Sequence, residues 1–480
     1  MRNADSCRSG GVTSRPDAVA TDRRRARAGG LPARAWLLAG LVGTWAAPPP
    51  LAGFAGEAAG VSVAAEQSAP AASGTPCRDH RRRALEPPPG GGPLRVSPGA
   101  PLVVAWFGPS DPGDAVTGDL WQAAKLAFDE ANAATSGRPL ELRPCWAKNP
   151  WGTGVAKLFH LVYHEPVVAV LGSVDGPATH LAEQVVAKAQ LPLVSPVSSD
   201  ASVNFAGVPW MFSCAPPDSA FAPVLAAEIA RELRSGGEGL ALVNATDHDS
   251  RQTARALLSA LAERGLTPDR QLEFTPGGDT FEVQLRALGD FRPAVLLLLA
   301  GAEDSARFLR GVRRRDLHPV VFGAPAMGRR AFRKQAGPVA EGVRFPWLAV
   351  ATPETRAALQ RFQAAFQARA GHPADYAARQ TYDAARLLIA AIRRGGADRR
   401  AVCEALRALS PWPGVAGEIA FDGLGRNLRP VTHLATIRKG VVIPLTRSDG
   451  SQTDLSAPPG KSPRPSRPGA LHFVRKTTGH

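Results

Sequence analysis

The sequence predicts an α/β fold of two similar, doubly wound lobes, each built on a parallel sheet. Three observations predict it. Its 480 residues can form two or three domains, short apolar runs alternate with amphipathic helices, and one strand–helix–strand stretch occurs twice. The composition, 44% hydrophobic and 21% charged, is that of a globular protein.

Buried strands and amphipathic helices alternate through the first half of the chain. Residues 102–107 form an apolar run that ends in turn-forming residues, and residues 119–134 follow with their apolar side chains on one helical face. The same reading gives strands at 140–145, 167–171 and 193–196, with helices at 154–164 and 178–189. Alternation of this kind needs crossover connections, so we expect a parallel sheet with helices on both faces.

The second half repeats the pattern. Strands are expected at 239–243, 294–299, 320–322 and 343–348, with helices at 250–264 and 302–314. Pro166 opens an apolar run and Pro192 opens the next, 26 residues later; Pro293 and Pro319 have the same separation around a similar pattern. A match this close indicates two copies of one α/β unit and hence two similar lobes.

The region after residue 350 is read differently. Helices at 355–370, 377–394 and 399–408 have no strands between them, so we expect them to cover a lobe built earlier. Residues 417–423 and 430–439 are then predicted to form a strand pair.

The two ends of the chain have compositions of their own. Arginines precede the apolar run 35–47, which has the length of a signal-peptide core and is too short to span a bilayer. A short buried helix is the alternative interpretation of this run. The predicted organisation is a signal region at 1–55, a disordered linker at 56–100, lobe one at 101–215 plus 349–428, lobe two at 216–348 plus 429–446, and a disordered basic tail at 447–480.

Charge and cysteines limit the partners. The net charge is +15, but most of it lies in the two tails, and no aromatic residues are interleaved with it, so nucleic acid is not an expected partner. Once the signal region is removed, four cysteines remain (Cys77, Cys145, Cys214 and Cys403), and one or two disulfides in any of three pairings are compatible with the sequence.

Sequence motifs give little support for a catalytic, cofactor or metal site. GxGxxG, GxxxxGK[ST], GxSxG and CxxC are all absent, so we expect no cofactor and no catalytic residue. His160 and His164 have metal-ligand spacing, but a solvated or packed helix face is the preferred interpretation, and no metal site is predicted. The run from Asp247 to Asp249 is read as a helix N-cap in preference to acid–base machinery. Of Trp106 and Phe107, one is expected in the core, and the other could stack on a ligand.

Several short stretches together resemble a known family: Gly118-Asp119, Leu171-Gly172-Ser173, Leu193-Val-Ser-Pro196, Tyr382-Asp-Ala384 and Gly417-x-Ile-x-Phe-Asp-x-x-Gly425. Their order and spacing resemble the type I periplasmic binding proteins, in particular the leucine/isoleucine/valine-binding branch that serves ABC importers. The resemblance covers roughly residues 100–446. It implies three hinge crossovers between the lobes, near 214–218, 344–348 and 428–432, and a ligand held where the strand ends face each other.

The resemblance also implies a site in the loops that follow the strands, where ligands of open parallel sheets bind. The candidate ligand-binding residues are Thr117, Ser173, Gly176, Ser198, Ser199, Asp249, Gly301 and Pro325. Ser198 and Ser199 fall where the amino-acid binders hold a substrate carboxylate, although a polar loop before a helix is nearly as good an interpretation. Pro325 stands where an acidic residue would hold the substrate ammonium, Thr117 stands where an aromatic residue is common, and Gly176 replaces a usual serine.

The expected function is therefore that of a monomeric solute-binding protein, periplasmic or otherwise exported. It would take up a small polar ligand between its lobes, deliver it to an ABC permease, and have no stable membrane insertion after signal removal. A ligand-sensing module of the same fold is the alternative. An enzyme on this scaffold is disfavoured by the missing motifs.

Overall fold

The computed structural model describes residues 94–134, 137–147, 150–278 and 280–445. The predicted signal region, the linker up to residue 93 and the basic tail lie outside these residues. Residues 94–100 contain no helix or strand, yet the backbone N–H of Leu94 donates to Ala397 and the guanidinium of Arg138 donates to the carbonyls of Ser97 and Ala100. No described helix combines the length and the apolar character that crossing a membrane requires.

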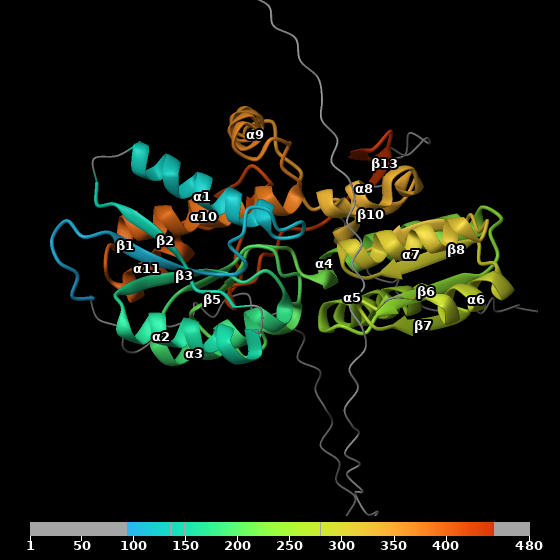
Figure 1. The fold of residues 1–480 in the computed structure, drawn as a ribbon, viewed down its shortest axis with the longest axis horizontal. Coiled ribbons are helices and arrows are strands. Elements are labelled where there is room, and N and C mark those ends of the chain that lie inside the picture. Colours follow the sequence, from blue (N-terminus) through green and yellow to red (C-terminus); the bar gives the residue numbers. More distant parts are fainter. Residues whose placement is uncertain (1–93, 135–136, 148–149, 279, 446–480) are drawn as a thin grey trace, which may run out of the picture. The chain divides into compact units, whose positions relative to one another are not determined.

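The first sheet has five strands, all parallel, in the order β2-β1-β3-β4-β5. They are β1 (Leu102–Phe107), β2 (Leu140–Pro144), β3 (Val167–Gly172), β4 (Leu193–Ser195) and β5 (Met211–Ser213). One face packs against α1 (Gly118–Ala133), α9 (Arg356–Ala370), α10 (Tyr376–Gly395) and α11 (Arg399–Ala408), and the other against α2 (Val155–His164) and α3 (Gly176–Ala189). Figure 1 shows α1 and α10 on one side of this sheet and α2 and α3 on the other.

Strand β1 shows why this sheet is apolar throughout. Its side chains alternate between two hydrophobic clusters, so Trp106 packs with the α1 and α10 layer and Phe107 packs with the α2 and α3 layer. Both rings are fully buried. The expectation that one of the two could stack on a ligand is therefore wrong, because helices cover both faces of the sheet.

The second sheet has seven strands in the order β14-β13-β10-β9-β8-β6-β7. Five run parallel: β6 (Leu240–Ala245), β7 (Arg270–Phe274), β8 (Val295–Leu299), β9 (Val320–Gly323) and β10 (Arg344–Pro346). Antiparallel β13 (Leu434–Arg438) and β14 (Val441–Pro444) extend the sheet at the β10 edge.

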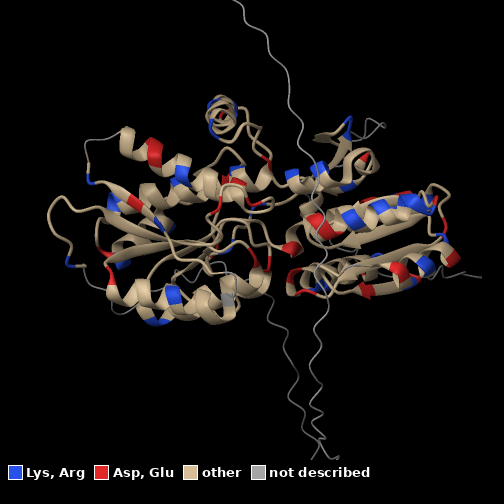
Figure 2. Ribbon diagram, in the orientation of Figure 1, with Lys and Arg blue, Asp and Glu red and all other residues tan. Residues whose placement is uncertain are grey.

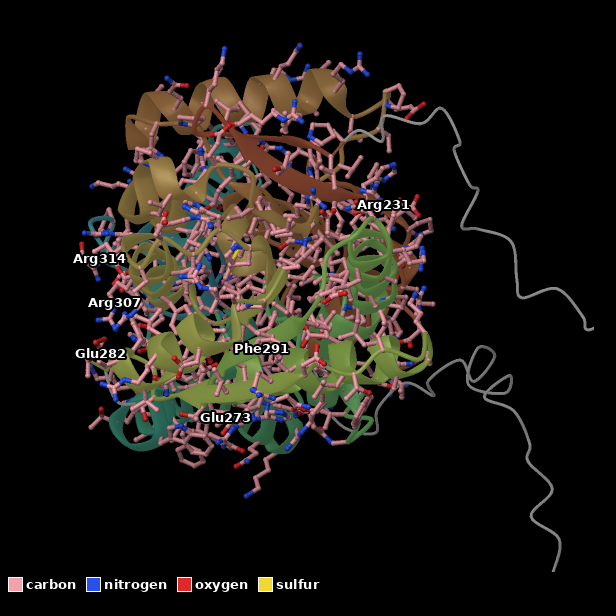
Figure 3. The ribbon with its side chains drawn as sticks, turned by 90° about the vertical axis from the view of Figure 1, so that its right-hand side faces the viewer. Arg231, Glu273, Glu282, Phe291, Arg307 and Arg314 are labelled. Atoms are coloured by element: carbon pink, nitrogen blue, oxygen red, sulfur yellow. The ribbon has the colours of Figure 1, made fainter. Side chains whose placement is uncertain are left out.

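Helices cover both faces of the second sheet as well. One face packs against α4 (Asp218–Arg234) and α5 (His248–Ala262), and the other against α6 (Glu282–Phe291), α7 (Ala302–Arg314) and α8 (Arg330–Ala336). Figure 3 views this half end-on, with Arg231 of α4 and Arg307 of α7 at opposite margins.

The internal repeat is confirmed. The strand order β1-β3-β4-β5 in the first sheet corresponds to β6-β8-β9-β10 in the second. The two copies of the repeat, β3-α3-β4 and β8-α7-β9, therefore lie at equivalent positions in their sheets. The predicted class, two similar doubly wound parallel-sheet lobes, is the observed one. The chain passes between the sheets three times, at residues 214–217 before α4, at 347–355 before α9, and at 428–433 before β13.

The predicted pairing of residues 417–423 with 430–439 is wrong. Strand β12 (Glu418–Ile419) pairs instead with β11 (Trp412–Pro413) in a small separate sheet. Strand β13 pairs with β10 and β14 because Leu434, Ala435 and Ile437 belong to the two hydrophobic clusters of the second lobe. The two segments lie on different sides of the third crossover.

The three described cysteines (Cys145, Cys214 and Cys403) are free and buried, so no disulfide joins any two of them. Burial raises the pKa of the Cys145 thiol to about 12 and that of Cys403 to about 11, which keeps both in the unreactive thiol form. Cys77 lies outside the described residues.

Candidate functional site

Loops at the carboxyl ends of the two parallel sheets meet between the lobes. Lobe one contributes the start of α3 and the loop that follows β4, and lobe two contributes the starts of α4 and α5. Figure 1 labels these three helices. Three contacts join them: the Gly176 amide to Asp249, His248 to Asp200, and the Asp218 amide to the carbonyl of Ser199. We call this region the junction. It lies where open α/β sheets bind ligands.

Two carboxylates cap α3 at the junction. Asp175 is the N-cap and accepts the backbone N–H of Ala178 at 2.7 Å, and Asp249 of lobe two accepts the N–H of Gly176 at 3.1 and 3.2 Å. Burial, with Asp175 adding repulsion, raises the pKa of Asp249 to about 7. Burial also raises the pKa of Asp175. The donors at this helix start are therefore already taken by the protein's own carboxylates.

Asp200 lies between two imidazoles. Its Oδ2 is 2.7 Å from His248 Nε2 and 3.3 Å from His180 Nε2, and its Oδ1 accepts from the backbone N–H and the hydroxyl of Ser202. Burial alone would raise the pKa of Asp200, but the bonds from His180, Ser202 and His248 hold it well below its usual value. Hydrogen bonds to Asp200 and Glu183 raise the pKa of His180 to about 9.

Two polar atoms at the junction are buried without a hydrogen-bond partner among the described residues. They are Ser198 Oγ and Asp218 Oδ1, on side chains that are each 4% exposed. The other oxygen of Asp218 accepts from Thr253 Oγ1 at 3.0 Å. Burial raises the pKa of Asp218 to about 7, against the lowering effect of hydrogen bonds from the Ser199 and Thr253 side chains, and the charges of Asp249 and Asp200 add to the rise. Figure 2 marks acidic positions where α4 and α5 begin. Orphaned buried polar atoms indicate a place for a ligand.

The structure brings four predicted residues to the junction (Gly176, Ser198, Ser199 and Asp249) and places the others elsewhere. Ser173 is fully buried and bonds Thr179 Oγ1 at 2.5 Å inside lobe one. Thr117 is the N-cap residue of α1, and its hydroxyl donates to Asp114. Gly301 is an exposed N-cap of α7, and Pro325 is buried at the start of a 3₁₀ helix, η4 (Pro325–Gly328).

A second contact between the lobes lies near Thr117 and Pro325. Arg329, directly after η4, donates to the carbonyl of Val116 and, at 2.9 Å, to Asp375, the N-cap of α10. Beside it is a cavity of about 480 Å³. Its lining includes acidic and basic side chains from both lobes: Asp114, Asp119, Glu303, Arg330, Lys334 and His372. Thr117, Gly301 and Pro325 are not among the residues that line this cavity.

A family comparison decides what this architecture belongs to. The sequence profile described as "Periplasmic binding protein" matches residues 106–439, more than half of the chain. The chain belongs to the periplasmic binding protein family. No curated protein sequence matches the chain.

Solved structures of periplasmic binding proteins share the fold. The substrate binding protein LivJ of a Streptococcus pneumoniae branched-chain amino acid transporter, in complex with isoleucine, is 20% identical with a TM-score of 0.63, over 71% of this chain and 97% of LivJ. The leucine binding protein LivK of Thermotoga maritima is 18% identical with a TM-score of 0.64, over 72% and 98%. A Rhodopseudomonas palustris solute binding protein in complex with benzoate is 16% identical with a TM-score of 0.62, over 72% and 96%.

In this periplasmic binding protein, the histidines at the junction are not arranged for acyl transfer. Ser202 Oγ lies 3.0 Å from His180 Nε2, but the hydroxyl donates to Asp200 Oδ1 at 2.7 Å. A serine nucleophile gives its proton to a neutral imidazole, and His180 is held protonated at neutral pH. The cluster of His180, Asp200, Ser202 and His248 is suited to binding and to holding the lobes together.

Sequence reasoning missed His180, Asp200 and Asp218 as site residues. The N-cap interpretation was right for Asp247, which accepts from the backbone N–H of Ser250 at 2.9 Å, but His248 and Asp249 face the other lobe. A usable signal was present: each missed side chain lies in a loop after a strand or in the first turns of the helix that follows it. One group of described residues could hold a metal ion, His180, Asp200 and His248, with its ligand atoms all within 4.8 Å of one another.

Proposed function

We propose that this chain is an exported solute-binding protein that takes up a small polar ligand between its two lobes for an ABC importer. The pair of orphaned atoms at the junction, Ser198 Oγ and Asp218 Oδ1, carries this proposal. A ligand that met both would remove the cost of leaving buried polar atoms unpaired. Membership of the periplasmic binding protein family supports a role in capture, and it supports a periplasmic location after removal of a signal peptide.

The free atoms favour an amide or an amine over a carboxylate. Ser198 can donate to an oxygen, and Asp218 Oδ1 can accept from an N–H group. The backbone donors of Gly176, Ala178 and Ser202 are already bonded to Asp249, Asp175 and Asp200. A ligand carboxylate would have to displace a protein carboxylate to reach these donors. We assign the ligand to small amides and amines.

Entry of a ligand requires the lobes to move apart, since Ser198 and Asp218 are almost wholly buried. The three passages of the chain between the sheets, at 214–217, 347–355 and 428–433, are where such a hinge would bend. Small-angle scattering with and without a confirmed ligand tests this motion.

A thermal-shift screen of amides, amines, short carboxylates and amino acids tests the function. A ligand that binds the native state raises its melting temperature. We expect amides or amines to raise it in the wild-type protein, and Ser198→Ala to reduce the shift. Ser235→Ala is the matched control, because that exposed hydroxyl bonds only its own helix end. The proposal is wrong if no compound shifts the melting temperature, or if Ser198→Ala responds like the control. Permease and ATPase genes beside this one would support transport over sensing.

A further inference from the structure

Two imidazoles, one from each lobe, face the same carboxylate oxygen. His180 comes from the second turn of α3, Asp200 from the loop after β4, and His248 from the first turn of α5. Nε2 of each ring lies 3.3 Å (His180) or 2.7 Å (His248) from Asp200 Oδ2. The rings are 5.7 Å apart and nearly perpendicular, at 85°. Three ligand atoms of the kinds that transition metals prefer therefore converge on one point.

In the structure Asp200 Oδ2 is bonded to both imidazole nitrogens, and the hydroxyl of Ser202 also lies 3.0 Å from His180 Nε2, so a bound cation would displace these contacts. Oδ1 of Asp200 is occupied by the backbone N–H and the hydroxyl of Ser202, at 2.9 and 2.7 Å, so Oδ2 is the oxygen that remains. On the far side of the His180 ring, Glu183 Oε2 lies 3.7 Å from Nδ1. A carboxylate behind a ligating imidazole fixes the orientation of the ring, as in many zinc sites.

We propose that His180, Asp200 and His248 form a binding site for a divalent transition metal, with Zn²⁺ the best fit, that joins the two lobes. Zinc bonds to imidazole nitrogen and carboxylate oxygen are about 2.0–2.2 Å long, which puts tetrahedral ligand atoms roughly 3.3–3.6 Å apart. Asp200 Oδ2 lies 3.3 Å from His180 Nε2, which already fits this spacing, and 2.7 Å from His248 Nε2, which would fit after a small outward shift of His248. The metal replaces the Nε2 protons of the two rings, which pass to solvent, together with the two hydrogen bonds that Asp200 accepts from them, and water completes the tetrahedron.

The consequence is that metal binding and lobe contact depend on each other. Two ligands belong to lobe one and the third to lobe two, so the complete site exists only while the lobes touch at the junction. Sequence spacing could not reveal the site, because 48 residues separate Asp200 from His248. The proposal is independent of the organic ligand, and it holds or fails whatever that ligand is.

Isothermal titration calorimetry of the full-length, chelator-treated protein with zinc chloride tests the proposal. We expect one equivalent to bind, and His180→Gln or His248→Gln to weaken that binding by about 100-fold, at least as much as the loss of an outer-shell partner. Glutamine keeps an N–H that can donate to Asp200. The control is the double variant His160→Gln, His164→Gln, which removes two imidazoles that lie 4.5 Å apart on one helix. It should bind zinc like the wild type.

A second readout separates this site from any other. Zinc should raise the melting temperature of the wild type and of the His160/His164 control, but not of His248→Gln. The proposal is overturned if no equivalent of zinc binds, or if binding survives in both single variants, as it would if other residues held the metal. If a single variant does not fold, X-ray absorption at the zinc edge of the His160/His164 control decides: two imidazole ligands there support the site, and their absence refutes it.

Discussion

The carboxylate of Asp249, in the first turn of α5, accepts the backbone N–H of Gly176, the first residue of α3, across the boundary between the lobes. The two oxygens lie 3.1 and 3.2 Å from the amide nitrogen. A lobe-two side chain thus occupies the end of a lobe-one helix, where the helix dipole attracts an anion.

A side chain at position 176 should disrupt this contact. A Cβ there would lie 2.8 Å from Asp200 Oδ2 and even closer to Asp249 Oδ1, so one of the carboxylates must move. We expect Gly176→Ala to lower the free energy of unfolding by about 1–3 kcal/mol, as overpacking of a tight site does. Urea denaturation measures it. Gly301→Ala is the control, since a Cβ there meets nothing within 4 Å. Equal stabilities of the two variants would contradict the packing at Gly176.

The buried ion pair between Arg329 and Asp375 should be costly to break. Asp375 accepts from the Nε of Arg329 at 2.9 Å and from the backbone N–H groups of Arg330, Ala377 and Ala378. We expect Asp375→Ala to cost about 3–5 kcal/mol, because it leaves a buried guanidinium uncompensated. Denaturant unfolding checks this. Glu404→Ala, which breaks the exposed pair of Glu404 with Arg400, should cost less than about 0.5 kcal/mol. A similar loss in both variants would argue against burial as the cause.

Asp218 should make stability fall as the pH rises. Its pKa is about 7 in the folded protein, above its ordinary 3.8. Between pH 3.8 and 7, Asp218 keeps a proton in the folded state that it has lost in the unfolded chain. The stabilisation that this proton provides is therefore fully present below about pH 4 and is lost as the pH rises through 7. We expect the stability of the wild type relative to Asp218→Asn to fall by up to about 4 kcal/mol over that range.

Unfolding of both proteins in urea at a series of pH values measures this difference. The control is Asp316→Asn, which changes a carboxylate that is 93% exposed. A flat difference between the wild type and Asp218→Asn would mean that Asp218 stays ionised when buried.

Ser198 and Thr253 should differ in how much stability the loss of their hydroxyls costs. The Ser198 hydroxyl has no hydrogen-bond partner among the described residues, so Ser198→Ala should leave the free energy of unfolding within about 0.5 kcal/mol of wild type. Thr253 Oγ1 donates to Asp218 at 3.0 Å, so Thr253→Val should cost about 1–3 kcal/mol by leaving a buried oxygen unpaired. Thermal or urea unfolding of the ligand-free protein checks both values. A large loss in Ser198→Ala would reveal a partner for that hydroxyl.

Leucine, isoleucine and valine should bind poorly or not at all. Their carboxylate would compete with Asp249 and Asp175 for the backbone donors at the start of α3. Calorimetry with each amino acid measures this, with an amide identified in the thermal-shift screen as the positive control. Micromolar or tighter binding of any of the three would refute the assignment of the ligand class.

The sequence by itself determined the class of fold and most of its parts. Apolar runs such as Leu102–Phe107 are buried on both faces only in a helix-covered parallel sheet, and the doubled Pro-to-Pro spacing revealed the two lobes. Local patterns sufficed because burial and helix periodicity act over a few residues. The pairing of β13 with β10 escaped prediction because it joins segments about 90 residues apart.

Only the tertiary structure decided what the loops do. The sequence placed Gly176, Ser198, Ser199 and Asp249 in loops after strands. It did not reveal that Asp249 binds the Gly176 amide, or that the Ser198 hydroxyl bonds none of the residues that the structure describes. It gave no indication that His180, Asp200 and His248 converge. Contacts of this kind form between residues that the chain brings together only when two lobes pack, and their energies depend on burial and on charges from distant segments. No local pattern records those quantities, so the site had to be read from the folded molecule.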